Sequence, residues 1–261
     1  MKAEYINHMG SDLSVVNAAR VSFDKESEWG FDRSAKTLDE AEALADKLNG
    51  TVDTDYIYSD RWMGGYPVQY LKPEDAKLIR YLAKHNHWTP FAHTSISLRM
   101  SAPVPIRTQC FKHKQGLVEN EESRRYISGT PEVFYPETWR KAPTNGAKQG
   151  SSDEEIIWLK EDQWMMTTSV KAAYRDAVGH SMQIYARMIE SGVCPEQARF
   201  VLPQGCEVNW IWTGNLYAFA NFYLKRTEAH AQKEIRDLAE DVGKIVQPLF
   251  PVSWAALTAE V

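Results

Sequence analysis

The chain has 261 residues, of which 43% are hydrophobic and 25% are charged, and its formal net charge is -5. This length can supply the core of a single domain, and no apolar stretch is long enough for a membrane-spanning helix. The acidic balance disfavours a nucleic-acid partner, because no general basic field would attract a polyanion. The amino-terminal residues also lack the apolar core of a signal peptide, so we expect a soluble cytoplasmic protein without a membrane partner.

The first part of the chain predicts one strand and two helices. Residues 2–7 read as a short strand, and Ser11 is placed to cap the helix that follows it. The segment 27–65 has its own capping box, formed by Thr37 and Glu40, ahead of an apolar helical series. We expect this segment to be an accessory helical hairpin or lid inserted into a single domain that spans residues 1–261.

The middle of the chain predicts a helix, a strand and a loop. Pro73 suits the first turn of a helix, and residues 95–102 alternate apolar and polar side chains as a half-buried strand does. Pro105 can begin a short helix that ends at Gly116. Proline and glycine are frequent in 134–152, which we therefore expect to be a loop.

The last part of the chain predicts three helices. The first has an acidic start at 153–155 and an apolar series that continues toward Gly192. A short helix begins at Pro195, includes 195–199 and is ended by Pro203; a long helix covers 215–246, with Asn215, Arg226 and His230 on one side. Together these elements predict an α+β fold with a mixed β-sheet and several long helices.

Cysteines and histidines show no pattern of a disulfide framework or a metal site. The three cysteines, Cys110, Cys194 and Cys206, are odd in number and widely spaced, and the seven histidines form no HExxH pair. We therefore predict no metal ion. The sequence also lacks both GxGxxG and GxxxxGK[ST], so any nucleotide cofactor needs an architecture other than a Rossmann or P-loop fold.

The most informative stretch is 107–126, which holds five Lys or Arg residues against three Glu in an otherwise acidic chain. Within it, side chains at positions i, i+3 and i+4 share one helical face: Gln109, Lys112 and His113. Cations, an imidazole, carboxylates and a hydroxyl suit a phosphorylated heterocycle that forms hydrogen bonds. By itself, however, a run of mixed charge is more often a solvated surface.

This stretch resembles the signature of the flavin-dependent thymidylate synthases, in which Arg-His-Arg precedes Asn-Glu-x-Ser-x-Arg-Tyr. Here the triplet is Lys112-His113-Lys114, and the spacer to Ser123 is one residue longer. Lysine lacks the bidentate fork of arginine, so it would hold an anion as a point charge. Four further stretches resemble the same family in the same order: 12–22, 89–93, 195–203 and 212–232.

The resemblance implies the fold of the thymidylate synthase-complementing proteins and the reductive methylation of dUMP to dTMP. Methylenetetrahydrofolate would donate the carbon, and FAD reduced by NADPH would carry the hydride. It also implies a homotetramer, because the sites of this family are built from several subunits. Arg226 matches the arginine placed against the uracil ring and is the expected catalytic residue, with no cysteine nucleophile.

The resemblance also implies two sets of binding residues. The positions that match FAD contacts are His93, Ser95, Lys112, His113, Lys114, Glu121, Asn215, Asn221 and His230. The positions assigned to dUMP are Gln109, Lys112, Glu121, Ser123, Arg124, Arg125, Arg199 and Arg226. Tyr217 stands where the family usually carries arginine, which weakens the expectation of a flavin contact there.

Three alternatives remain open at this point. A nucleotide- or RNA-binding protein could use 107–126 with Phe111 and Tyr126 as stacking partners, although the net charge of -5 disfavours it. A flavoprotein of the same fold could act on another pyrimidine nucleotide. Finally, Leu202-Pro203-Gln204-Gly205-Cys206 is faintly similar to the nucleophile turn of the cysteine-dependent synthases, but no histidine follows it.

Overall fold

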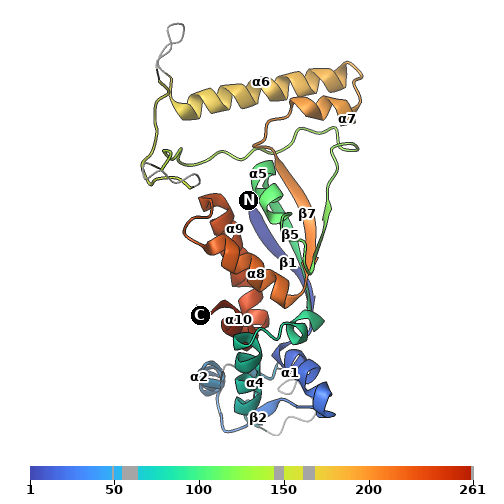
Figure 1. Ribbon diagram of the computed structural model, residues 1–261, viewed down its shortest axis with the longest axis vertical. Helices are drawn as coiled ribbons and strands as arrows, with labels where there is room; N and C mark the ends of the chain where they lie inside the picture. Colours follow the sequence, from blue (N-terminus) through green and yellow to red (C-terminus); the bar gives the residue numbers. More distant parts are fainter. Residues whose placement is uncertain (49, 55–63, 144–149, 161–167, 260–261) are drawn as a thin grey trace.

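A four-stranded sheet runs through the middle of the elongated molecule (Figure 1). The computed structural model describes residues 1–261 except 49, 55–63, 144–149, 161–167 and 260–261. In spatial order, the strands are β1 (Lys2–Met9), β5 (Ser95–Pro103), β7 (Glu207–Gly214) and β6 (Leu117–Glu121). The α+β class is confirmed. Every pairing within this sheet is antiparallel, in contrast to the expected mixed sheet, because β7 lies between β5 and β6, which run in the same direction.

Alternation along the central strands decides which face of the sheet is covered. The predicted alternation in β5 is confirmed, since four side chains are fully buried: Ile96, Leu98, Met100 and Ala102. Trp210 and Trp212 continue this buried face on β7, where the Trp212 ring packs edge-on against Phe222 at 4.8 Å between centroids. Strands β6 and β7 are not among the elements that the sequence predicts.

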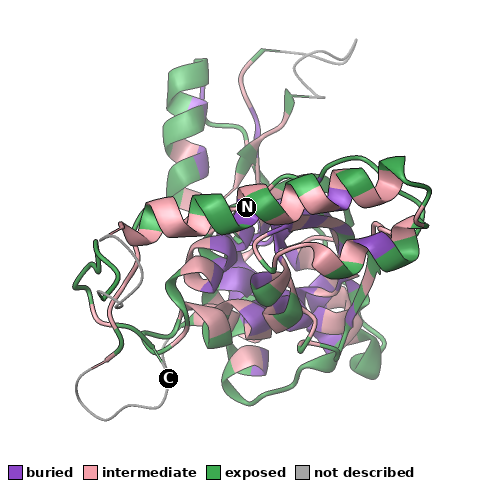
Figure 2. Ribbon diagram, turned by 90° about the horizontal axis from the view of Figure 1, so that it is seen from above, coloured by how far each residue is buried: buried purple, intermediate pink, exposed green. Residues whose placement is uncertain are grey.

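Helices α8 (Leu216–Thr227) and α9 (Lys233–Val246) cover this apolar face of the sheet. The same core continues beyond the end of the sheet into α10 (Pro251–Thr258), α4 (Pro73–Lys84) and α1 (Asp12–Arg20). Figure 2 shows the buried residues gathered between these helices and the sheet. The start of α1 after Ser11 and the start of α4 at Pro73 are both confirmed.

The final long helix that we expect at 215–246 is two helices. Asn215 caps α8, its Oδ1 accepting a hydrogen bond from the backbone N of Ala218 at 2.9 Å. Glu228 takes an extended conformation (ψ 142°), and α9 begins only at Lys233. The break allows α9 to fold back beside α8, so both helices bury apolar faces in one core. His230 therefore lies in the connection, not one helical turn beyond Arg226.

Among its described residues, the inserted segment has one helix and a small sheet that the sequence did not predict; the rest of the expected helical hairpin or lid falls outside the described residues. Helix α2 (Leu38–Leu48) begins as predicted, with Thr37 Oγ1 accepting from the backbone N of Glu40 at 3.3 Å. Three short antiparallel strands accompany it: β2 (Gly30–Asp32), β4 (Val68–Tyr70) and β3 (Thr51–Val52). They share a separate apolar cluster with α2. Part of the predicted 27–65 insertion lies outside the described residues.

At the opposite end of the molecule, α6 (Val170–Glu190) lies across α7 (Pro195–Ala198), away from the main helical layer (Figures 1 and 2). The acidic run 153–155 does not begin this helix. Instead, Glu155 forms an isolated bridge with Arg140, and Ser169 caps the helix by accepting from the backbone N of Ala172 at 3.1 Å. Helix α5 (Val104–Cys110) follows β5 and ends before Lys112.

Candidate active site

The first polar cavity, which we name the Arg226 pocket, has a volume of about 550 Å³. It lies where α5, the end of α8 and the connection to α9 meet the chain around Arg140. The residues lining it are Gln109, Arg140, Gly150, Ser151, Lys225, Arg226, Glu228, His230, Ala231 and Gln232. Three residues expected from the sequence, Gln109, Arg226 and His230, thus meet in one cavity.

Hydrogen bonds within the chain fix the orientation of Arg226. Its Nε donates to His113 Nε2 at 2.9 Å, and its Nη2 donates to the backbone oxygen of Gln109 at 3.1 Å. The side chain of Gln109 in turn donates through Nε2 to Gln232 Oε1 at 2.8 Å. The His113 ring also packs edge-on against Phe222 at 5.1 Å, so the apolar core supports the acceptor.

His113 is arranged to be neutral at physiological pH. Burial, together with the positive charges of Arg226 and Lys225, lowers its pKa from 6.5 to about 4. A neutral imidazole presents one nitrogen as an acceptor, which is the role that His113 Nε2 takes toward Arg226. Arg226 therefore carries the positive charge, and His113 holds the guanidinium in place.

A second cavity, the Arg199 pocket, has a volume of about 390 Å³ and holds four other expected residues: Glu121, Ser123, Arg124 and Arg199. Arg107 also lines it and pairs with Glu121 at 2.9 Å between Nε and Oε2. Burial raises the pKa of Glu121, although the nearby Arg107 acts in the opposite direction. Three arginines and a serine hydroxyl form a donor set that suits a phosphorylated ligand.

A third cavity of about 770 Å³ lies between α4, α8 and α10 and includes Asn221, another residue expected to contact FAD. Tyr217 lines the same cavity and donates from Oη to Asn86 Oδ1 at 2.8 Å. The aromatic side chain that replaces the usual arginine is therefore held by a neighbouring loop and offers no positive charge.

The remaining expected residues lie outside these three cavities. Lys112 and Lys114 are exposed beyond the end of α5, so Lys112 does not share a helical face with Gln109 and His113. Lys114 pairs with Glu119. Arg125 pairs with Glu196 at 3.2 Å. Near the start of β5, His93 is exposed and Ser95 is half-buried. Asn215 serves as the helix cap described above.

Several residues that line these cavities are not among the site residues expected from the sequence. Gln232 and Lys225 flank recognised positions near the end of α8, so local spacing could have suggested them. No local pattern indicates Arg140 or Ser151, because they reach the Arg226 pocket from a region outside the family resemblance. Arg107 belongs to the basic stretch 107–126 but was not assigned a role.

The buried cysteines are poor nucleophiles. Burial raises the pKa of Cys110 to about 12 and that of Cys206 to about 11. Because the thiolate is the reactive form, both side chains remain thiols at neutral pH. Among the described residues, no group of three or more His, Cys, Asp or Glu side chains is placed to hold a metal ion. No helix in the described ranges is both long and apolar enough to cross a bilayer.

The fold and its pockets define an α+β protein with cationic cavities suited to a small phosphorylated ligand. The chain belongs to the family described as thymidylate synthase complementing protein, whose sequence profile matches residues 4–252. This match spans both the helical layer and the sheet, and it confirms the family that the sequence motifs indicate.

Among relatives, the flavin-dependent thymidylate synthase of Thermus thermophilus is 33% identical over 183 residues, 70% of this chain and 63% of that protein. The matched region therefore spans less than two thirds of that relative. The flavin-dependent thymidylate synthase of Thermotoga neapolitana is 28% identical over 253 residues, which cover 97% of this chain and 88% of that protein.

A solved structure with a similar fold is the UMP/dUMP methylase PolB from Streptomyces cacaoi bound with 5-Br dUMP. Its TM-score is 0.67 at 25% sequence identity, and the alignment covers 98% of this chain and 94% of that one. The alignment therefore spans nearly the whole of both chains.

Proposed function

We propose that this protein is an FAD-dependent thymidylate synthase that methylates dUMP to dTMP. Methylenetetrahydrofolate is the proposed carbon donor, and NADPH is the proposed reductant of the flavin. The observation that carries the proposal is the Arg226 pocket, where a permanently charged guanidinium is held by a neutral imidazole in a chain of this family.

Arg226 is the proposed catalytic residue because it can stabilise charge that develops on the uracil ring. A guanidinium stays protonated in proteins and cannot act as an ordinary base. It can instead donate hydrogen bonds to the N3/O4 side of uracil as negative charge forms there, which makes C5 more nucleophilic. His113 and the backbone oxygen of Gln109 keep this donor oriented before the substrate arrives.

FAD would supply hydride transfer when bound, while the chain supplies its contacts. Lys112 forms no ion pair with any described residue, whereas Lys114 is partly neutralised by Glu119. Lys112 is therefore the stronger candidate for a phosphate of FAD, and Asn221 and His230 offer further polar contacts from two cavities. His93, Ser95, His113, Glu121 and Asn215 remain proposed members of the same site.

The double substitution Lys112→Ala/Lys114→Ala tests this assignment. It should remove the flavin without unfolding the protein, because both side chains are exposed. Flavin absorbance per protein, measured after gel filtration, reports the occupancy. Full occupancy in a folded double variant would show that other groups neutralise the cofactor.

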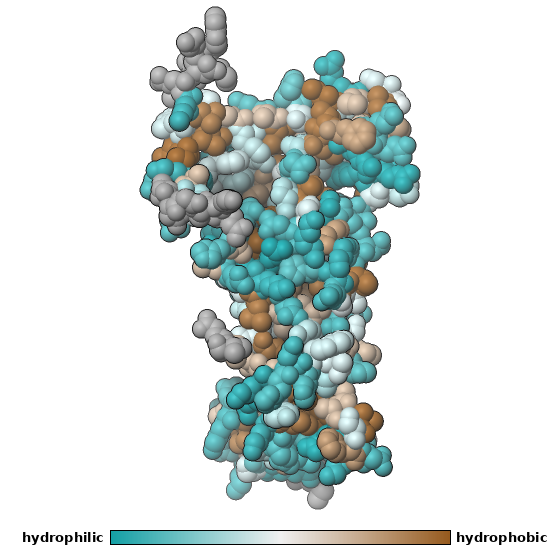
Figure 3. All heavy atoms as spheres, in the orientation of Figure 1, coloured by the Kyte–Doolittle hydropathy of each residue, from teal (hydrophilic) through white to brown (hydrophobic). Residues whose placement is uncertain are grey.

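The dUMP contacts are proposed to come from two subunits of a homotetramer. Gln109 and Arg226 lie in one pocket of the chain, whereas Ser123, Arg124 and Arg199 lie in another. Figure 3 shows apolar side chains exposed around the α6 end of the molecule. Those that could pack in an interface include Trp158, which is 59% exposed, and Phe200, which is 82% exposed. Light scattering should give a tetramer, and an active monomer would contradict this arrangement.

The decisive experiment is a turnover assay with dUMP, methylenetetrahydrofolate and NADPH. Product dTMP should appear only when all three are present, and the purified protein should be yellow. A protein that lacks flavin but binds RNA would instead support a nucleic-acid function of 107–126. We further propose that the protein is cytoplasmic and that its chain is one domain with an accessory insertion at 27–65.

UMP is a second candidate substrate, since the similar methylase PolB is described as acting on UMP and dUMP. The same assay with UMP in place of dUMP separates the two. Equal turnover of both nucleotides would favour a methylase with little discrimination at the ribose 2′ position.

A further inference from the structure

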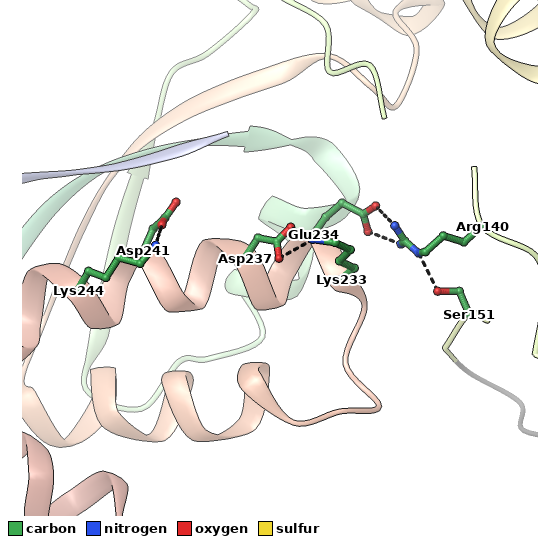
Figure 4. Close-up of polar contacts among 7 residues, drawn as sticks. All are labelled: Arg140, Ser151, Lys233, Glu234, Asp237, Asp241 and Lys244. Carbon is green, nitrogen blue, oxygen red and sulfur yellow. Dashed lines mark hydrogen bonds and ion pairs between the residues drawn. The ribbon is translucent and has the colours of Figure 1, made fainter. Parts of the chain in front are cut away.

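Arg140 forms a partly buried clasp at the wall of the Arg226 pocket. Its Nη1 and Nη2 each donate to one carboxylate oxygen of Glu234 at 2.8 Å, and its Nε donates to Ser151 Oγ at 2.7 Å (Figure 4). The two charged side chains are only 17% and 13% exposed. Because three directions of the guanidinium are already used within the chain, Arg140 is better placed to hold its neighbours than to grip a ligand.

Two other ion pairs on the same helix provide a contrast. They are Lys233 with Asp237, 51% and 48% exposed, and Lys244 with Asp241, 72% and 47% exposed (Figure 4). Exposed ion pairs of this kind contribute little to the stability of the folded chain. A pair removed from water has a desolvation cost that often cancels its attraction, so its main effect can be to select one geometry. The Arg140–Glu234 clasp is of this second kind.

The clasp fixes a paired segment of chain. The Lys141 backbone N donates to the Glu154 oxygen at 2.8 Å, and the Ile156 backbone N donates to the Trp139 oxygen at 2.7 Å. Arg140 therefore stands on a short antiparallel ladder, and Ser151 belongs to the connection between its two sides. Anchoring Arg140 to α9 thus also anchors this wall of the pocket.

A chain of polar contacts leads from the clasp to Arg226. Glu234 lies in the first turn of α9, two residues after Gln232, the N-cap residue of this helix. Burial raises the pKa of Glu234, but hydrogen bonds from Arg140, the backbone and Gln232 together lower it, so the carboxylate stays charged. Gln232 accepts from the Gln109 side chain at 2.8 Å, and the Gln109 backbone oxygen accepts from Arg226 at 3.1 Å.

We propose that Arg140 and Glu234 are positioning residues for Arg226, acting through Gln232 and Gln109. The clasp keeps Gln232 oriented toward α5. Through its hydrogen bond to Gln109, Gln232 then holds the backbone oxygen of Gln109 in place as an acceptor for the Arg226 guanidinium. Without the clasp, Arg226 retains its charge and its bond to His113 but loses a fixed second acceptor. This inference rests on the proposed function, in which Arg226 must meet the uracil ring in one orientation.

The test compares Arg140→Ala, Arg140→Lys and Glu234→Gln with the control Lys244→Ala. Small displacements of a catalytic group can cost up to about 10²-fold in rate. We expect Arg140→Ala to lower kcat by about tenfold to 100-fold while the KM for dUMP changes much less. Arg140→Lys should recover part of the loss, because it keeps the charge but not the fork. Lys244→Ala should leave kcat unchanged.

The double variant Arg140→Ala/Gln232→Ala tests whether Arg140 acts on Arg226 through Gln232. If Arg140 acts through Gln232, the losses in kcat of Arg140→Ala and Gln232→Ala should not add in the double variant. Additive losses would overturn the route, and a kcat for Arg140→Ala within twofold of the parent would overturn the positioning role. If Arg140→Ala does not fold, the isosteric variant Glu234→Gln tests the positioning role instead, and a kcat within twofold of the parent would again overturn it.

Amide hydrogen exchange gives a readout that does not depend on turnover. Exchange in the peptides that contain Gln109 and Gln232 should rise in Glu234→Gln and remain at the parent level in Lys244→Ala. Unchanged exchange in Glu234→Gln would overturn the inference even in an active enzyme. A parent protein with no dUMP turnover would refute the proposed function instead, and the exchange experiment would still report on the clasp.

Discussion

The Arg226 pocket and the Arg199 pocket both carry arginines, but the chain holds these side chains in different ways. Arg226 is fixed by a side-chain acceptor, a backbone oxygen and an aromatic core beneath them. Among the described residues, the one hydrogen bond that the Arg199 side chain donates is to the backbone oxygen of Glu196, at 3.2 Å on a short helix at the surface. The comparison teaches that one chain can hold its proposed polarising group in a fixed orientation while its proposed binding group stays open toward an incoming surface or ligand.

Arg226→Ala is expected to have the largest effect among the substitutions that test this difference between the two pockets. Removing a preorganised donor typically costs about 10²- to 10³-fold in rate, so turnover of dUMP should fall by that factor. Flavin content and thermal unfolding should stay close to those of the parent, and Arg226→Lys should recover little because the fork is lost. Steady-state kinetics measure the turnover, and flavin absorbance spectra measure the flavin content. Turnover within a few-fold of the parent would rule out the catalytic role.

Arg199→Ala should have a smaller effect, and mainly on binding. A hydrogen bond to a charged group contributes about 1.5–3 kcal/mol, so the Kd for dUMP should rise roughly tenfold to 100-fold. At saturating dUMP, kcat should remain near that of the parent, because this arginine is not expected at the reacting ring. Calorimetry and kinetics at high dUMP separate the two quantities. A fall in kcat with an unchanged Kd would assign Arg199 to the chemistry.

His113→Gln tests how the residue that holds Arg226 affects the pH dependence of the free energy of unfolding. His113 has a pKa of about 4 in the folded chain and an ordinary value of 6.5, so the unfolded chain binds more protons between these values. The free energy of unfolding should therefore fall as the pH drops from 6.5 to 4. Glutamine can accept from Arg226 but does not titrate, so the variant should lose less stability over this window. Parallel curves from chemical denaturation would contradict a buried neutral His113.

The smallest expected effect is that of replacing all three cysteines, Cys110, Cys194 and Cys206, by serine. Burial keeps Cys110 and Cys206 protonated at neutral pH, and the proposed reaction does not need a thiolate. Turnover should remain within a few-fold of the parent, with some loss of stability from serine in the core. Inactivity of a folded, flavin-loaded Cys206→Ser protein would restore the cysteine mechanism.

Elements with a strong local signal could be predicted from the sequence. The alternation of β5 and the proline at the start of α4 each depend on a few neighbouring residues, and the structure contains both elements. The break between α8 and α9 could not be read in this way, because apolar residues continue at helical spacing on both sides. Folding back is favoured only when the two helices share a core.

The residues of the candidate site also fall into those that the sequence predicts and those that only the folded structure identifies. The motifs predict Gln109, His113 and Arg226 as separate site residues, and in the structure hydrogen bonds join all three. The contact of Arg140 with Glu234 joins residues 94 positions apart and has no local pattern, so it requires the folded chain. The resemblance of its motifs thus indicates the family, and local composition and spacing indicate the charged groups and several helices and strands. The tertiary structure decides which groups meet, because burial and hydrogen-bond geometry depend on distant segments packing together.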